Sequence, residues 1–132
     1  MKMVVYITST DNREVIDLVK LYDNVGIMAT PSDYRLSSRR QRHAIDNGAF
    51  TAYANGTCFD DGVFLKALKN AKQGNPDFVV LPDIVAGGKK SLKYSAVWRE
   101  FLPDCFSWYL AAQDGITAKD IPTDMIKKIM PA

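Results

Sequence analysis

Short runs of β-branched and aromatic residues alternate with longer segments of helical periodicity along almost the whole chain. The runs predict strands over residues 3–9, 25–30, 76–85 and 105–115, and a short strand that ends at Asp46. The periodic segments predict helices over residues 11–23, 60–74, 87–103 and 119–130. Residues 31–42 are polar and basic, and we expect a loop or a short helix there. Parallel strands need long crossover connections, usually helices, so this alternation predicts an α/β fold with a parallel sheet.

Two architectures fit this order of elements: an open doubly wound sheet and a (β/α) barrel. A full barrel takes about 250 residues, whereas this chain has 132 residues. The chain therefore has room for about five β/α units. No linker or internal repeat interrupts it, and we expect a single domain over residues 1–132.

Composition narrows the classes of function. With 47% apolar and 24% charged residues, the chain reads as globular, and its net charge of +2 permits a nucleic-acid partner without demanding one. Two distant cysteines and one histidine cannot build a zinc cluster of the usual spacing, so we expect no metal or cofactor. No run approaches the roughly 20 apolar residues of a membrane span, which predicts a cytoplasmic protein without a membrane partner.

Polar residues stand where three of the predicted strands end. Asp46, Asp83 and Gln113 each follow an apolar run at the point where that run stops. The carboxyl ends of parallel strands share one rim in either architecture, and ligand sites are built at that rim. Taken singly, each residue suits an ordinary turn or cap equally well. Together, three polar residues on one rim favour a ligand site.

The segments that hold these residues resemble motifs of the tRNA-guanine transglycosylases, the queuine tRNA-ribosyltransferase family. DNGAF (46–50) resembles the family's DSGGF strand end, and FVVLPDIV (78–85) is similar to its strand that ends in a base-binding aspartate. YLAAQDG (109–115) resembles a strand that ends in glutamine before glycine. The likeness covers about residues 3–121 and is greatest to short phage and bacterial proteins related to the enzymes that insert 7-deazaguanines into DNA.

The resemblance implies a fold and a reaction. The fold is an incomplete (β/α) barrel of about five parallel units, and the reaction is a pentosyl transfer that exchanges guanine for a 7-deazaguanine in DNA or tRNA. Asp83 and Gln113 would hold the purine or 7-deazapurine base, since a carboxylate accepts from N1–H and the exocyclic amine. Asp46 would assist proton transfer at the glycosidic bond. The other pocket residues that we expect are Asn47, Gly48, Phe50 and Gly115.

The chain departs from the family pattern where catalysis is concerned. Exchange with retention needs one carboxylate as nucleophile and another as acid or base. The family's nucleophilic aspartate follows a glycine-glycine segment on a later strand, and neither precedes the end at IKKIMPA. We therefore expect a truncated chain that is inactive alone, a chain completed by another, or a non-catalytic purine- or nucleotide-binding half-barrel. An open sheet edge would favour self-association.

Two basic segments are candidates for contact with a nucleic-acid backbone. Arg39, Arg40 and Arg42 precede the short strand that ends at Asp46, although such runs are more often solvated loops. Lys89 and Lys90 follow two glycines at a predicted helix start, where backbone N–H groups can bind phosphate. The spacing there matches no known phosphate loop.

Overall fold

The computed structural model describes residues 3–123, and it is an α/β structure with one five-stranded parallel sheet. The strands lie side by side in chain order, each parallel to the next. This confirms the predicted parallel α/β fold. The strands are β1 (Val5–Thr8), β2 (Val25–Ala29), β3 (His43–Ile45), β4 (Val79–Val80) and β5 (Trp108–Tyr109).

Helical segments follow every strand. They are α1 (Arg13–Leu21), η1 (Pro31–Asp33), α2 (Leu36–Arg39), α3 (Ala49–Ala54), α4 (Asp61–Gly74), α5 (Lys89–Phe101) and η2 (Ala118–Asp120). The predicted helices over 11–23, 60–74 and 87–103 are confirmed as α1, α4 and α5. Of the helix predicted over 119–130, the part beyond residue 123 lies outside the described residues.

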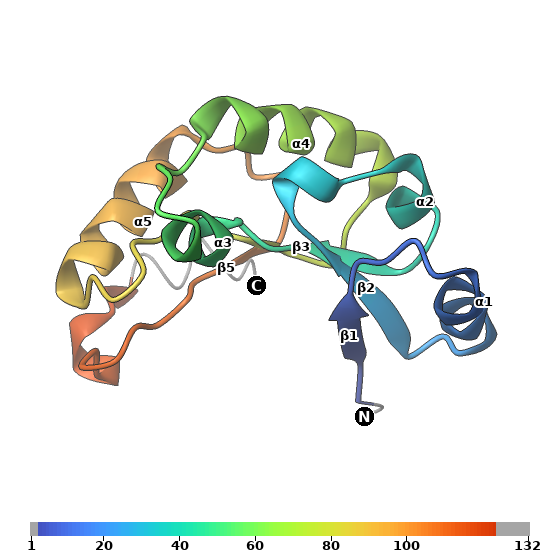
Figure 1. The fold of residues 1–132 in the computed structure, drawn as a ribbon. Helices are drawn as coiled ribbons and strands as arrows, with labels where there is room; N and C mark the ends of the chain where they lie inside the picture. The colour runs from blue at the N-terminus through green and yellow to red at the C-terminus, as the bar shows by residue number, and fades with distance from the viewer. Residues whose placement is uncertain (1–2, 124–132) are drawn as a thin grey trace.

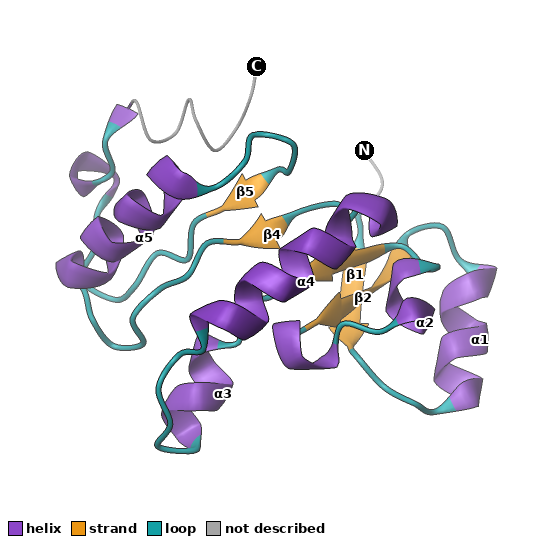
Figure 2. Ribbon diagram, turned by 90° about the horizontal axis from the view of Figure 1, so that it is seen from above, coloured by secondary structure: helices purple, strands orange, loops and turns teal. Residues whose placement is uncertain are grey.

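Because each strand lies beside the next strand of the chain, the strand order determines on which face of the sheet the helices lie. Right-handed crossovers between successive neighbours place the connecting helices on the same face of the sheet. Figure 1 shows α4 and α5 arching over one face, and Figure 2 shows α4 lying across the sheet from above. Within residues 3–123 the strand order does not reverse, so the described sheet has no switch point of the doubly wound kind.

The hydrophobic core fills the space between the sheet and these two helices. Trp108 of β5 and Phe64 of α4 are fully buried in it, with Ile45 of β3, Val79 of β4 and Leu81, which follows β4. The rings of Phe64 and Trp98 meet edge to face with their centroids 5.6 Å apart. The core therefore joins α4 and α5 to the central strands, whose carboxyl ends carry the candidate site.

An aromatic row crosses the other face of the sheet. The ring centroid of Tyr6 in β1 lies 5.3 Å from that of Phe78, which in turn stacks on Tyr109 of β5 at 4.0 Å. In a flat sheet β1 and β4 would stand about 14 Å apart, three strand spacings, so the sheet curves strongly. Gly26 of β2 lies beneath the Tyr6 ring, where a Cβ atom would come within 3.0 Å of Cδ1.

Three elements differ between the prediction and the structure. The strand predicted over 105–115 is only the two residues of β5. The strand predicted over 76–85 is reduced to β4, because Pro82 has no N–H to continue the ladder beyond the bond from Leu81 N to Tyr109 O. The helix α3 was not predicted, although the Asn55–Gly56 pair at its end is a typical stop signal. In the described part of the chain no helix is long and apolar enough to cross a membrane.

Gly74, the last residue of α4, gives a first testable prediction. A Cβ atom there would collide with the Tyr34 hydroxyl and lie 2.9 Å from Cγ of Arg39. Tyr34 cannot retreat easily, since it is buried and its hydroxyl is hydrogen-bonded to His43. We expect Gly74→Ala to lower the free energy of unfolding by about 1–3 kcal/mol, as overpacking does, measured by urea denaturation.

Gly62 in the first turn of the same helix is the matched control. A Cβ atom at Gly62 would meet only Oδ1 of Asp60, at an ordinary 3.4 Å. Gly62→Ala should therefore stabilise the chain by up to about 1 kcal/mol through helix propensity. Equal effects of the two substitutions would contradict the packing that we describe around Tyr34.

Candidate functional site

The three strand-end residues meet at one cavity on the carboxyl rim of the sheet. Asp46 follows β3, while Asp83 and Gln113 lie in the loops after β4 and β5, and all three line a cavity of about 210 Å³. Asn47 and Phe50 line it as well, and Val80, Val85 and Ala111 supply its apolar wall. The structure thus brings together residues that are far apart in the sequence, as the parallel sheet predicts.

Asp83 is the centre of the hydrogen bonds in this cavity. Its Oδ1 accepts from Nδ2 of Asn47 at 2.5 Å, and its Oδ2 accepts from Nε2 of Gln113 at 2.5 Å. A carboxylate offers about four lone-pair positions, so these two bonds leave acceptor capacity on both oxygens. The carboxylate is therefore fixed in direction and still able to accept from a ligand.

The backbone around Asp83 is held by two buried serines of α5. Oγ of Ser95 donates to Pro82 O at 2.7 Å, and Oγ of Ser91 accepts from Ile84 N at 2.9 Å. Both serines are almost fully buried. Neither serine was predicted as a site residue, although two hydroxyls four residues apart on one helical face were an available signal. They anchor the residues on either side of Asp83 to a rigid helix.

The loop between Asp83 and α5 has an unusual backbone. Ala86 has a φ of 59°, a left-handed conformation that non-glycine residues rarely adopt. Its N–H donates to Oε1 of Gln113 at 3.2 Å, so Gln113 bonds both the loop and the Asp83 carboxylate. A Cβ atom on Gly87 would lie 2.9 Å from the Ile84 carbonyl oxygen. Strained loops of this kind cluster at ligand sites.

The surroundings of Asp83 in the cavity raise its pKa. Burial raises the pKa of Asp83, and the charge of Asp46 raises it further, whereas the bonds donated by Asn47 and Gln113 lower it. Burial is the largest of these effects. A carboxylate in a partly dry site with neutral donors forms strong hydrogen bonds to a ligand's N–H groups.

The remaining predicted pocket residues differ in their placement. Phe50 is 67% exposed at the cavity, a position that suits stacking on a planar ligand. Gly48 has a φ of 80° at the N-terminus of α3, and its N–H donates to Oδ2 of Asp46 at 3.3 Å. Gly115 is exposed with a φ of 87° in the turn after Gln113 and does not line the cavity. Asn47 is buried, with a relative exposure of 3%.

A second cavity of about 240 Å³ lies on the other side of α3. Hydroxyl groups line it, but most bond locally: Thr57 Oγ1 donates to Ala52 O, and Thr30 Oγ1 pairs with Ser32 Oγ. Oδ1 of Asp60 accepts from Val63 N at the start of α4. These bonds join residues that are close in the sequence, whereas those around Asp83 link the ends of three strands, so the cavity of Asp83 is the candidate site.

Lys89 and Lys90 lie on the same rim as the cavity. They begin α5, which follows the Asp83 loop, and both are exposed. Nζ of Lys89 lies 3.5 Å from Oδ1 of Asp120 in η2. Both lysines therefore lie at the start of the helix that follows the Asp83 loop, and neither lines the cavity.

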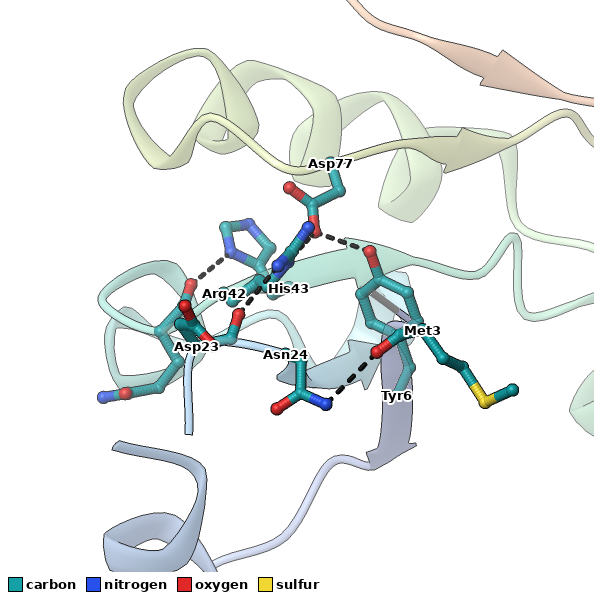
Figure 3. Close-up of polar contacts among 8 residues, drawn as sticks. Met3, Tyr6, Asp23, Asn24, Arg42, His43 and Asp77 are labelled. Carbon is teal, nitrogen blue, oxygen red and sulfur yellow. Dashed lines mark hydrogen bonds and ion pairs between the residues drawn. The ribbon is translucent and has the colours of Figure 1, made fainter. Parts of the chain in front are cut away.

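The structure does not bring the arginine segment to the cavity. Arg39, Arg40 and Arg42 precede β3 and so lie at the amino edge of the sheet, opposite the rim that carries Asp83. Figure 3 shows Arg42 and Tyr6 converging on Oδ2 of Asp77, at 2.8 Å and 2.5 Å. Arg42 also donates to Asp23 O at 2.7 Å, so it links segments of this chain.

His43, also drawn in Figure 3, belongs to the interior of that edge. Its Nδ1 lies 2.9 Å from Gln41 O, which can only accept, so Nδ1 carries the proton and Nε2 accepts from the Tyr34 hydroxyl at 2.9 Å. Burial raises the pKa of Tyr34 to about 12, and it lowers the pKa of His43. Neutral His43 is thus a buried structural residue.

Comparisons with protein-family models, curated proteins and solved structures found no match to this chain. The assignment of function therefore rests on the geometry of the cavity.

His43 generates a prediction about pH and stability. Because the folded chain keeps His43 neutral below its usual pKa of 6.5, the unfolded chain binds more protons there. We expect the free energy of unfolding to fall as the pH drops below about 6.5, by up to about 1.4 kcal/mol per unit. Urea denaturation between pH 8 and pH 5 measures this slope.

The control for this prediction is His43→Gln, which should flatten the slope in that range. Asp83 has the opposite effect on the dependence of stability on pH. Because its pKa is raised, the folded chain binds the Asp83 proton more tightly than the unfolded chain, and the stability that this adds is lost as the pH rises through the pKa of the folded chain. Repeating the series with Asp83→Asn separates the two contributions. A slope unchanged by His43→Gln would show that His43 is not held neutral.

Proposed function

We propose that this chain binds guanine or a 7-deazaguanine in the cavity of Asp83, as a transglycosylase-like protein whose substrate is DNA or tRNA. The observation that supports this most is the Asp83 carboxylate held between the amides of Asn47 and Gln113. The cavity of about 210 Å³ is smaller than the roughly 300–1,000 Å³ of sites for drug-sized ligands. A single base fits that size better than a whole nucleotide.

The chemistry of the cavity favours the guanine edge over other bases. Guanine presents N1–H and an exocyclic amine side by side, and both can donate to the acceptor positions left on Asp83. Gln113 keeps one Nε2 proton for an acceptor such as O6. Phe50 offers an exposed ring on which the base can stack. Adenine presents an acceptor at N1, which would lie against the acceptor oxygens of the Asp83 carboxylate and be repelled by them.

We assign proton transfer at the glycosidic bond to Asp46, and no base exchange to this chain by itself. Among residues 3–123, Asp46 and Asp83 are the carboxylates that line the cavity, and Asp83 is assigned to the base. Asp114 is exposed and does not line it. One carboxylate cannot act both as acid and as nucleophile in a retaining exchange. A non-catalytic purine- or nucleotide-binding half-barrel is therefore the second candidate.

Three further features belong to the same proposal. The curved sheet with helices on one face is, we propose, part of a (β/α) barrel, with open edges that favour self-association. Lys89 and Lys90 contact the phosphates next to the bound base. The exposed free thiols of Cys58 and Cys105 suit a reducing compartment, and we place the protein in the cytoplasm.

Asp83→Asn tests the base-binding role. The substitution keeps the shape of the side chain and removes its charge, so a charge-assisted bond worth roughly 1.5–3 kcal/mol is lost. We expect the affinity for guanine to fall about tenfold or more, and to fall less in Asp46→Asn, measured by calorimetric titration. Asp17→Asn on the exposed surface of α1 is the matched control. Equal affinities of Asp83→Asn and wild type would remove the base-binding assignment.

The catalytic assignment has its own test. We expect the 132-residue chain to incorporate no labelled guanine or 7-deazaguanine into tRNA or duplex DNA, because within residues 3–123 the cavity has no carboxylate besides Asp46 and the base-binding Asp83. The assay is run beside guanine binding, so that an unfolded sample is recognised. Robust incorporation that Asp46→Ala abolishes would show that a nucleophile is present and that the chain is an active enzyme.

A further inference from the structure

We propose that Asn47 is a positioning residue, which aims the Asp83 carboxylate into the cavity and makes no contact of its own with the bound base. This inference rests on the proposed base-binding role of Asp83. It changes the expectation from the sequence, in which Asn47 itself contacts the substrate.

The amide of Asn47 has no proton left for a ligand. Its Nδ2 donates one bond to Leu81 O at 2.7 Å and the other to Oδ1 of Asp83 at 2.5 Å. Its Oδ1 accepts from Ala49 N at 2.8 Å. Asn47 is buried, with 3% of its surface exposed, so a ligand could reach the amide only by breaking these bonds.

The orientation of the amide follows from its partners. Leu81 O and Asp83 Oδ1 only accept, and Ala49 N only donates. A turned-over amide would set oxygen against two acceptors and NH₂ against a donor. Asn47 is therefore locked, and it joins the end of β3 to the segment after β4 at the point where the carboxylate must be held.

Among the described residues, the groups that act on the Asp83 carboxylate besides Asn47 are its own backbone N–H, Gln113 and Asp46. Gln113 donates to the other oxygen from the β5 side, and Asp46 on the β3 side adds a like charge that opposes ionisation. From α5, Ser91 bonds the backbone next to Asp83. Loss of the Asn47 donor should therefore both release the carboxylate and raise its pKa.

The first test needs no ligand. The carboxyl carbon of Asp83 is titrated by NMR in the wild type, in Asn47→Ala and in Asn24→Ala. Asn24 is the matched control, because its amide donates to Met3 O at the other end of the sheet. We expect the midpoint for Asp83 to rise by about one pH unit or more in Asn47→Ala and to stay in place in Asn24→Ala. An unchanged midpoint in Asn47→Ala would overturn the proposal.

Wild-type protein provides a second measurement, which is independent of how well Asn47→Ala folds. The Nδ2 proton resonances of Asn47 should shift with the same midpoint as the Asp83 carboxyl carbon, because the two groups share a hydrogen bond. Amide resonances that do not respond to the titration of Asp83 would contradict the contact.

A double-mutant cycle separates positioning from direct contact with the base. If Asn47 acts only through Asp83, Asn47→Ala weakens guanine binding about tenfold in the wild type and has no further effect in the Asp83→Asn background. A loss of affinity that persists in that background would show that Asn47 binds the base itself. If guanine does not bind the wild type at all, the proposed function fails, while the carboxyl titration still decides the role of Asn47.

Discussion

The carboxylate of Asp83 ties together the ends of three neighbouring strands. Asn47 bonds it from the end of β3 and Gln113 from the loop after β5. The backbone ladder is thin in this region, since β3 and β4 share one register pair and Pro82 cannot donate. Hydrogen bonds from side chains to the charged Asp83 therefore link the ends of β3, β4 and β5, as backbone hydrogen bonds link the strands elsewhere in the sheet.

The two edges of the sheet use an aspartate in different ways. At the amino edge the guanidinium of Arg42 pairs with Asp77, so its negative charge is compensated within the chain. At the carboxyl edge the bonds to Asp83 come from neutral amides, which orient the charge without cancelling it. An oriented carboxylate that is bonded by neutral donors can accept from a ligand's N–H groups, as the proposed base-binding role of Asp83 requires.

The sequence predicted the elements whose signals are local, and missed those that depend on distant partners. Helical periodicity and the apolar runs mark α1, α4 and the strands, and the parallel sheet then places Asp46, Asp83 and Gln113 on one rim. No local signal reveals that Arg42 pairs with Asp77, 35 residues away. The short helix α3 was missed because six residues carry too little periodicity.

Curvature of the sheet connects these observations. Because Gly26 has no side chain, the Tyr6 ring can lie over β2 and reach Phe78 and Asp77, near the start of β4. A sheet bent in this way directs the side chains at its strand ends toward a common point, whereas a flat sheet would leave them parallel. The convergence of Asp46, Asp83 and Gln113 on one small cavity is thus a consequence of the same curvature. The aromatic row on one face of the sheet and the cavity of Asp83 at its carboxyl rim are two results of one backbone shape.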